Sequence, residues 1–274
     1  MTDLRDMLGY DFGHDKRREE AKRKQHKIAL ELICQGYEEF MGWSKKAGKI
    51  PTEITDRYNP TKEQVLEFSR ALVRYKDLKD FARYTADYLT ALMHSSKDAE
   101  FEIDMTGLNK AGITLDRLGY ELQGKKLTVN GNAGDWVGRI AQNSQITVNG
   151  DAGVSVGYDA KNSQITITGN AGDWVGAGAQ NSQITVNGNA GDVVGECAQG
   201  SQITINGNAG AFVGGSAKDS QITINGNAGN GVGYVAKDSQ IRIKGTYKSL
   251  SDEIAEGTEI YQEQNGIWVR VHPK

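Results

Sequence analysis

A strict period of 19 residues runs through the second half of the chain and limits what it can fold into. Leucine or isoleucine recurs at one repeat position, and glycine recurs four residues later, with no insertion or deletion. The two series are Leu127, Ile146, Ile165, Ile184, Ile203, Ile222 and Ile241, and Gly131, Gly150, Gly169, Gly188, Gly207, Gly226 and Gly245. Self-similarity at a short fixed period is the signature of stacked repeat architectures. Residues 127–245 are therefore predicted to form a solenoid and not a compact catalytic domain.

Each repeat unit reads as one strand followed by turns. The unit Ile184–Gln202 begins Ile-Thr-Val-Asn-Gly, in which apolar and polar residues alternate as in a strand with one buried face. Nothing after the second glycine of a unit resembles a helical turn, so a strand–helix repeat is excluded. We expect one coil of a parallel β-helix per unit, with equivalent strands about 4.8 Å apart. Gln145, Thr147 and Asn149, with their repeats, are then expected to form outward-facing ranks.

The chain is predicted to be an α+β protein in two parts. Residues 1–100 lack the period and are expected to form an α-helical domain, and residues 101–274 to form the β-solenoid. Within the solenoid we expect a degenerate first coil at about 101–126, regular coils at 127–245 and a C-terminal cap at 246–274. Irregular terminal coils are needed because an exposed solenoid end invites pairing between strand edges.

Three helical segments are expected in the first part. A helix over about 15–41 should turn one side toward a core, with Ile28, Leu32, Ala29, Ile33 and Tyr37 at spacings of four. A second helix should start at a capping box formed by Thr61 and Gln64. It is followed by the apolar Val65, Phe68, Leu72 and Val73. A third segment, at roughly 77–95, carries Leu78, Phe81, Ala82, Leu89 and Leu92. Residues 48–59 are predicted to be a loop.

Composition sets the class of protein. Hydrophobic residues make up 38% of the chain, which is enough for packed cores. No run approaches the roughly 18 apolar residues of a transmembrane helix, and Met1–Met7 lacks the segments of a signal peptide. We therefore expect a folded cytoplasmic protein without a membrane contact. Cys34 and Cys197 lie in regions of different character, so we expect no disulfide and interpret both as small buried residues.

The repeat resembles a known family. Its Gly-Asn-Ala-Gly, the Val-Gly that follows and the closing Ile-x-Val-x-Gly, as in 170–176 and 184–188, carry the resemblance. They are similar to the GXGXG β-helix domain that ends the large chain of glutamate synthase and that also forms part of formylmethanofuran dehydrogenase. The resemblance covers about residues 113–262 and implies a right-handed β-helix that holds other domains or subunits together. The helical first hundred residues depart from both enzymes, as does the lack of flavin and amidotransferase domains.

The sequence offers no constellation for catalysis or cofactor binding. The glycines follow a structural period, and none leads into a helix or a Gly-Lys-Ser/Thr sequence, so they do not indicate a nucleotide loop. Acidic residues occupy the candidate calcium column only at Asp135, Asp173 and Asp192. Asn132 and its repeats are better explained by turn chemistry and stacked amide hydrogen bonds. No His or Cys pair has metal-ligand spacing, so we expect no metal and no cofactor.

Function is expected where the repeats differ, because packing and turns explain the shared positions. One variable column is Trp136, Ser155, Trp174, Val193, Phe212 and Gly231, and the other is Arg139, Tyr158, Ala177, Glu196, Gly215 and Tyr234. Trp and Tyr dominate interface energetics. The candidate partner-binding residues are therefore Trp136, Tyr158, Trp174, Phe212 and Tyr234. The alternative is that these side chains pack under the helical region or the solenoid's own tail.

A basic segment is the second candidate surface. It contains Lys16, Arg17, Arg18, Lys22, Arg23, Lys24 and Lys27. Arg17, Arg18 and Arg23 are candidates to bind an acidic protein surface or the phosphates of a nucleic acid. Nothing else in the sequence supports binding to a nucleic acid. The alternative is a solvated helix face with stabilising charge pairs.

The sequence thus predicts a non-catalytic structural scaffold or assembly subunit whose partner is another protein or a second copy of itself. Two alternatives stay open. One is a subunit of a glutamate-synthase-like or formylmethanofuran-dehydrogenase-like complex, with the chemistry on other chains. The other is an ice-binding or surface-binding solenoid, since regular threonine ranks resemble ice-binding surfaces.

Overall fold

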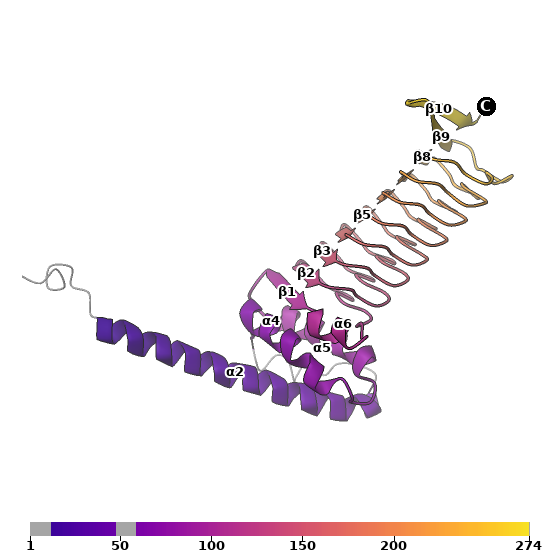
Figure 1. The fold of residues 1–274 in the computed structure, drawn as a ribbon. Helices are drawn as coiled ribbons and strands as arrows, with labels where there is room; N and C mark the ends of the chain where they lie inside the picture. Colours follow the sequence, from indigo (N-terminus) through magenta and orange to yellow (C-terminus); the bar gives the residue numbers. More distant parts are fainter. Residues whose placement is uncertain (1–11, 48–58, 274) are drawn as a thin grey trace, which may run out of the picture.

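The computed structural model describes residues 12–47 and 59–273. A helical region is followed by a straight rod of stacked coils (Figure 1). The helices are α2 (Phe12–Ala47), α4 (Lys62–Ala71), the 3-10 helix η1 (Leu72–Tyr75), α5 (Phe81–Ser95) and α6 (Thr106–Lys110). The strands are β1 (Glu100–Asp104), β2 (Lys126–Asn130), β3 (Gln145–Asn149), β4 (Gln164–Ile167), β5 (Gln183–Val186), β6 (Gln202–Ile205), β7 (Gln221–Ile224), β8 (Gln240–Ile243), β9 (Glu259–Gln264) and β10 (Ile267–His272). A helical region followed by a parallel β-solenoid with 19-residue coils confirms the predicted fold class.

One 10-stranded sheet runs along the rod. Its strands follow one another in sequence order, and β1 to β9 are parallel. The strands β2 to β9 begin at 19-residue intervals, from Lys126 to Glu259. Equivalent residues of successive repeats therefore pair, as Ile165 does with Ile184 and Thr166 with Thr185.

The core is a stack of equivalent layers. In the coil of β5 the buried residues are Ile184, Val186, Ala190, Val194 and Ala198. Alternate strand positions face outward, so in β3 the flanking Gln and Asn are exposed and the central Thr is half-buried. Because side chains of a strand alternate between its two faces, the repeat fixes which residues meet solvent. The predicted outward ranks of Gln, Thr and Asn are confirmed.

Backbone geometry explains why glycine and asparagine recur at two positions of the repeat. A Cβ on Gly188 would lie 2.7 Å from the carbonyl oxygen of Gly169 in the preceding coil, closer than side chains tolerate. The bare backbone instead lets the Gly188 N–H donate to that oxygen at 2.8 Å. Just before each strand the backbone is left-handed, with φ of 50° at Asn143 and 48° at Asn181. That column holds only Asn, Asp and Gly, the residues that accept this conformation at least cost.

The helical region closes the N-terminal end of the rod. The hydrophobic core is continuous from Ile33 in α2 to Ile260 in β9. Asn109 of α6 accepts the Asn132 N–H at 2.7 Å, as Asn132 accepts the N–H of Asp151 one coil later at 2.9 Å. The side chain of Asn109 therefore supplies the hydrogen-bond acceptor that the Asn of a preceding coil would have provided.

Irregular coils lie at both ends of the regular array, as predicted. Before it, the buried Leu118 and Leu122 accept backbone N–H groups of the next coil at 2.9 and 2.8 Å. After it, the Ala255 N–H donates to Ala236 at 3.0 Å, and Ile260 pairs with Ile241. Within the predicted C-terminal cap, β10 follows the turn Asn265–Gly266 and pairs antiparallel with β9.

The helical predictions hold in part. The capping box at Thr61 and Gln64 is confirmed. The prediction that Ile28 and Leu32 face the core is wrong, since they are 48% and 44% exposed. The buried side of α2 is instead Ile33, Tyr37, Phe40 and Met41. The part of the helix before His26 extends away from the other described helices (Figure 1).

The third helix begins later than predicted. It starts at Phe81, after Asp80 adopts a left-handed φ of 62°. Leu78 thus lies in the preceding turn, 41% exposed, and Ala82 lies on the solvent side of α5, so neither joins Phe81, Leu89 and Leu92 in the core. The predicted loop at 48–59 falls almost wholly outside the described residues.

Candidate functional site

Five aromatic residues on two neighbouring columns form a flank that we call the aromatic ridge: Trp136, Tyr158, Trp174, Phe212 and Tyr234. Trp136, Trp174, Phe212 and Tyr234 are 37%, 40%, 50% and 45% exposed, and Tyr158 is half-buried. Successive members of the series Trp136, Trp174 and Phe212 are two coils apart, or about 10 Å along the rod by the strand spacing. The ridge is a regularly spaced row of large side chains open to solvent.

The two columns interlock. In two coils a large side chain in one column is accompanied by a small residue in the other, in the pairs Trp174 with Ala177 and Phe212 with Gly215. The small partner is buried, with Ala177 only 3% exposed. A Cβ on Gly231 would lie 2.8 Å from the Phe212 ring, so this ring lies directly on the next coil. Each ridge aromatic is therefore held in place by packing and keeps part of its surface free.

Cation–π contacts fix the N-terminal end of the ridge. The Arg139 guanidinium carbon lies 5.9 Å from the centre of the Trp136 ring and 5.4 Å from that of Tyr158. Both distances fall within the range at which a guanidinium is attracted to an aromatic face. Arg139 thereby links the aromatic rings of two successive coils.

The column that holds Trp136, Trp174 and Phe212 has a backbone conformation that suits glycine. The φ angles are 59° at Trp136, 65° at Trp174 and 66° at the β-branched Val193. Such left-handed geometry costs a non-glycine residue on the order of 1–3 kcal/mol. Gly231 occupies the same column without that cost.

The polar columns of the solenoid are occupied by bonds between coils. Asp173 accepts the Asp192 N–H at 2.8 Å, and Asp192 accepts the Ala211 N–H at 2.7 Å. Asn170 accepts the Asn189 N–H at 2.9 Å, which confirms the predicted amide stacking. Over 12–47 and 59–273, no group of three or more His, Cys, Asp or Glu residues is placed to hold a metal ion. The acidic column is a structural ladder.

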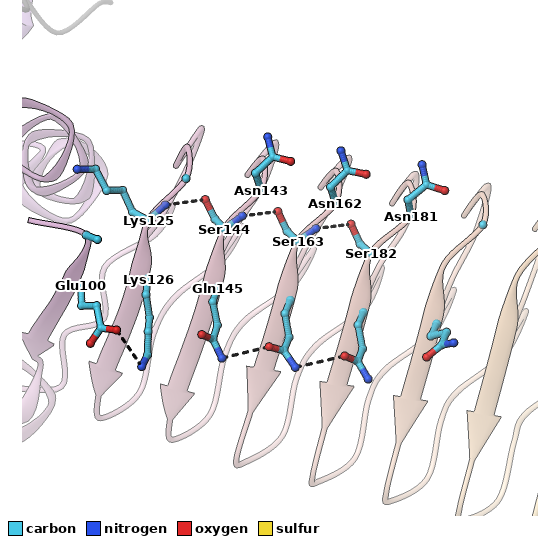
Figure 2. A pocket seen from close by; sticks show the side chains of 16 residues that line it. Glu100, Lys125, Lys126, Asn143, Ser144, Gln145, Asn162, Ser163, Asn181 and Ser182 are labelled. Carbon is cyan, nitrogen blue, oxygen red and sulfur yellow. Dashed lines mark hydrogen bonds and ion pairs between the residues drawn. The ribbon is translucent and has the colours of Figure 1, made fainter.

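A shallow groove of about 800 Å³ follows the corner between the turns and the strands (Figure 2). Along it the Ser144 N–H donates to the Ser163 hydroxyl at 3.2 Å, and the Gln145 amide donates to Gln164 at 3.1 Å. At its N-terminal end Lys126 pairs with Glu100 at 3.5 Å. The groove offers a repeating surface of amides and hydroxyls that are already bonded to one another along the rod.

Neither of two further reactive groups is activated. The expectation that Cys197 is buried is wrong, because a left-handed corner with φ of 53° directs it to the surface. Partial desolvation, followed by the carboxylates of Glu196 and Asp159, raises the pKa of its thiol, which keeps it protonated and weakly nucleophilic. Desolvation, and then the charge of Lys125, lowers the pKa of His94. The neutral ring accepts the Gln123 N–H at 3.2 Å.

The basic segment lies on the projecting half of α2. Lys16, Arg18, Lys22, Arg23, Lys24 and Lys27 are all exposed there. The side chain of Arg17 lies outside the described residues. Glu19 pairs with Lys22 at 2.7 Å, and this pairing lowers the pKa of the carboxyl. After the basic segment, α2 contacts α4 through His26, which lies 2.9 Å from Glu67. This half of α2 lies away from the rod that carries the ridge (Figure 1).

Comparisons with known proteins give no further guide: no protein-family model matches the chain, and no curated protein sequence matches it. Within the described residues, none of the helices is both long and apolar enough to cross a membrane. The ridge, the groove and the ends of the rod are therefore the features that bear on function.

Proposed function

We propose that the chain is a non-catalytic assembly subunit that binds another protein through the aromatic ridge. The observation that carries this proposal is the exposure of Trp136, Trp174, Phe212 and Tyr234 in one row on a rigid rod. Exposed aromatics on a monomer surface mark interaction sites, and Trp and Tyr are the most frequent anchors of protein interfaces.

Rigidity favours this use of the ridge. The rings are positioned by the backbone ladder and by the buried small residues beside them, such as Ala177. A partner that covers them therefore orders few additional side chains, so less conformational entropy opposes binding. The two-coil spacing favours a partner with pockets about 10 Å apart.

The polar ladders support a role without chemistry. Side chains such as Asp173 and Asn170 accept backbone hydrogen bonds from the next coil. The pKa of the Cys197 thiol is raised rather than lowered. A cytoplasmic location agrees with the two free cysteines, Cys34 and Cys197. We keep as a second candidate a subunit of a larger enzyme complex of the glutamate synthase or formylmethanofuran dehydrogenase kind, which uses the same ridge.

A surface that binds ice through its threonine rank is less favoured. Thr147 and its equivalents are half-buried between exposed ranks of Gln and Asn. The longer amide side chains beside them, such as Gln145, bond one another along the rod. The hydroxyls are thus recessed and do not form a flat exposed plane.

The experiment compares the wild-type chain with Trp136→Ala/Trp174→Ala after tagged expression in the source cells. We expect the variant to lose a defined set of co-purifying proteins and to elute as a smaller species on gel filtration. Each ring is about three-fifths covered, so its truncation should cost the isolated chain roughly 1–2 kcal/mol and a few degrees of melting temperature.

Leu78→Ala is the matched control, since it removes an apolar side chain of similar exposure, 41%, from the helical region. It should leave the co-purifying set unchanged. A ridge variant that keeps every partner, or that unfolds without losing one from its folded fraction, would show that the ridge is internal packing. The basic half of α2 would then be the surface to test next.

A further inference from the structure

The C-terminal strand β10 leaves both a sheet edge and an apolar face uncovered. It stands last in the strand order of the described residues and pairs there with β9. Ile267, Trp268 and Val269 are 67%, 38% and 37% exposed. Figure 1 shows β10 at the far end of the rod, beyond the stacked coils. A strand edge with exposed apolar side chains is a template for pairing with another strand.

The two faces of β10 differ in character. Trp268 lies over the guanidinium of Arg242 at 5.9 Å, and Arg270 donates to Glu259 at 3.0 Å. Arg242 and Glu259 occupy the outward columns of β8 and β9, so Trp268 and Arg270 share the outer face. Ile267 and Val269 lie on the opposite, inner face, above the end of the core.

The backbone of β10 has free groups in a defined pattern. The turn Asn265–Gly266 has φ of 53° and 80°, as in two-residue hairpins, and it sets Gln264 opposite Ile267. Backbone groups of an antiparallel strand point alternately toward and away from its neighbour. The N–H and C=O groups of Trp268 and Arg270 therefore point away from β9.

We propose that this edge docks β10 of a second copy of the chain, about a twofold axis through Val269. Antiparallel pairing in this register sets Val269 against its own copy. On the outer face it sets Trp268 against Arg270 of the second copy, a cation–π pair like the one that Trp268 already makes with Arg242. On the inner face it brings Ile267 and Val269 of both copies together over the open end of the core; the regular part of β10 ends at Arg270, where the register with β9 shifts.

The free edge of β10 is self-complementary, which favours a second copy of the chain as its partner. Moving the axis to Arg270 would place two arginines opposite one another, and like charges in that position are destabilising. Because β10 lies beyond the last coil (Figure 1), a twofold axis at its free edge directs the two rods in opposite directions. One strand per copy makes a small interface, so the dimer should be weak and concentration-dependent. The inference does not depend on the ridge binding a partner.

Sedimentation equilibrium of the full chain over a range of concentrations tests the proposal. We expect the wild type to dimerise reversibly and Val269→Lys to raise the dissociation constant at least about tenfold, because it sets two like charges face to face. Val269→Glu should do the same. An equal mixture of the two variants should recover the dimer, since the axis then pairs lysine with glutamate. Leu78→Lys, at an equally exposed apolar position, should dimerise as the wild type does.

Each variant must match the wild type in circular dichroism and melting temperature, so that a change in its dimerisation reports on the interface and not on misfolding. A wild-type chain that stays monomeric would overturn self-pairing and leave the edge to a strand of another protein. A dimer that survives Val269→Lys would place the interface elsewhere. A mixture of lysine and glutamate variants that stays monomeric would overturn the axis through Val269. Loss of ridge partners in the Trp variant tests a different surface, so either proposal can fail alone.

Discussion

The asparagine ladder can be tested one side chain at a time. Asn189 accepts the Asn208 N–H at 2.8 Å, and its own backbone N–H donates to Asn170 at 2.9 Å. Asn189→Ala removes this acceptor and the longer, 3.3 Å bond that the Asn189 side-chain amide donates to Asn170, and it leaves the backbone bond to Asn170 in place. A hydrogen bond of this kind contributes about 0.5–1.5 kcal/mol net. Because Asn189 and Asn208 are exposed, water can reach the orphaned N–H, and we expect a loss of about 1 kcal/mol.

The natural sequence supplies the control. Asp151 occupies the same column, and its carboxylate accepts the Asn170 N–H at 2.7 Å. Asn189→Asp keeps an acceptor oxygen at the same place, so we expect it to retain most of the stability that Asn189→Ala loses. The double variant Asn189→Ala/Asn208→Ala should lose about twice as much as the single one. The two substitutions remove the acceptors of two different backbone N–H groups, those of Asn208 and Asn227.

Urea titration followed by circular dichroism is the assay. The midpoint should fall for Asn189→Ala while the slope stays constant, since the surface exposed on unfolding does not change. For a chain of this size the loss corresponds to roughly 2–4 °C in melting temperature. Equal midpoints for the Ala and Asp variants, or an Ala variant as stable as the wild type, would refute the role assigned to the ladder.

Three further outcomes are expected. Deleting the whole coil Ile184–Gln202 should preserve the fold with a loss of roughly 1–2 kcal/mol, because β4 can pair in register with β6, whereas deleting only Asn187–Gly195 should split or abolish the melting transition. Arg117→Met should destabilise by roughly 1–3 kcal/mol in thermal melts, because it breaks a 3.1 Å ion pair with the buried Asp87. The His94 pKa is lowered in the fold, so the unfolded chain binds the proton first; stability should fall as pH drops below about 6.5, and His94→Gln should flatten that dependence.

The solenoid was predictable because its packing is set by a local pattern. The alternation in each unit decides which side chains enter the core, and the period decides which residues pair, so Ile184 and its equivalents required no tertiary information. The end coils followed from the same alignment. The positions of Trp136 and Trp174 on the surface followed from their place beside an inward valine.

The helical region was less predictable because its burial depends on contacts between segments far apart in sequence. Ile28 and Leu32 have the same spacing as the buried Ile33 and Tyr37, and only the position of α4 and α5 decides which pair is covered. The strand β1 also left no repeat signal. It pairs Glu100 with Lys126, an offset of 26 instead of 19, because α6 and the first irregular coil lie between them.

The two proposed surfaces have a joint consequence for affinity. Pairing through β10 would place two ridges on one rod, related by the twofold axis at Val269. Binding of the first ridge to a twofold-symmetric partner then makes binding of the second intramolecular, which multiplies avidity without any new contact. Val269→Lys should weaken attachment to such a partner while leaving the affinity of a single ridge unchanged. Trp136→Ala/Trp174→Ala should abolish attachment while leaving the dimer intact. A partner whose attachment depends on the ridge but not on Val269 must therefore engage one rod at a time.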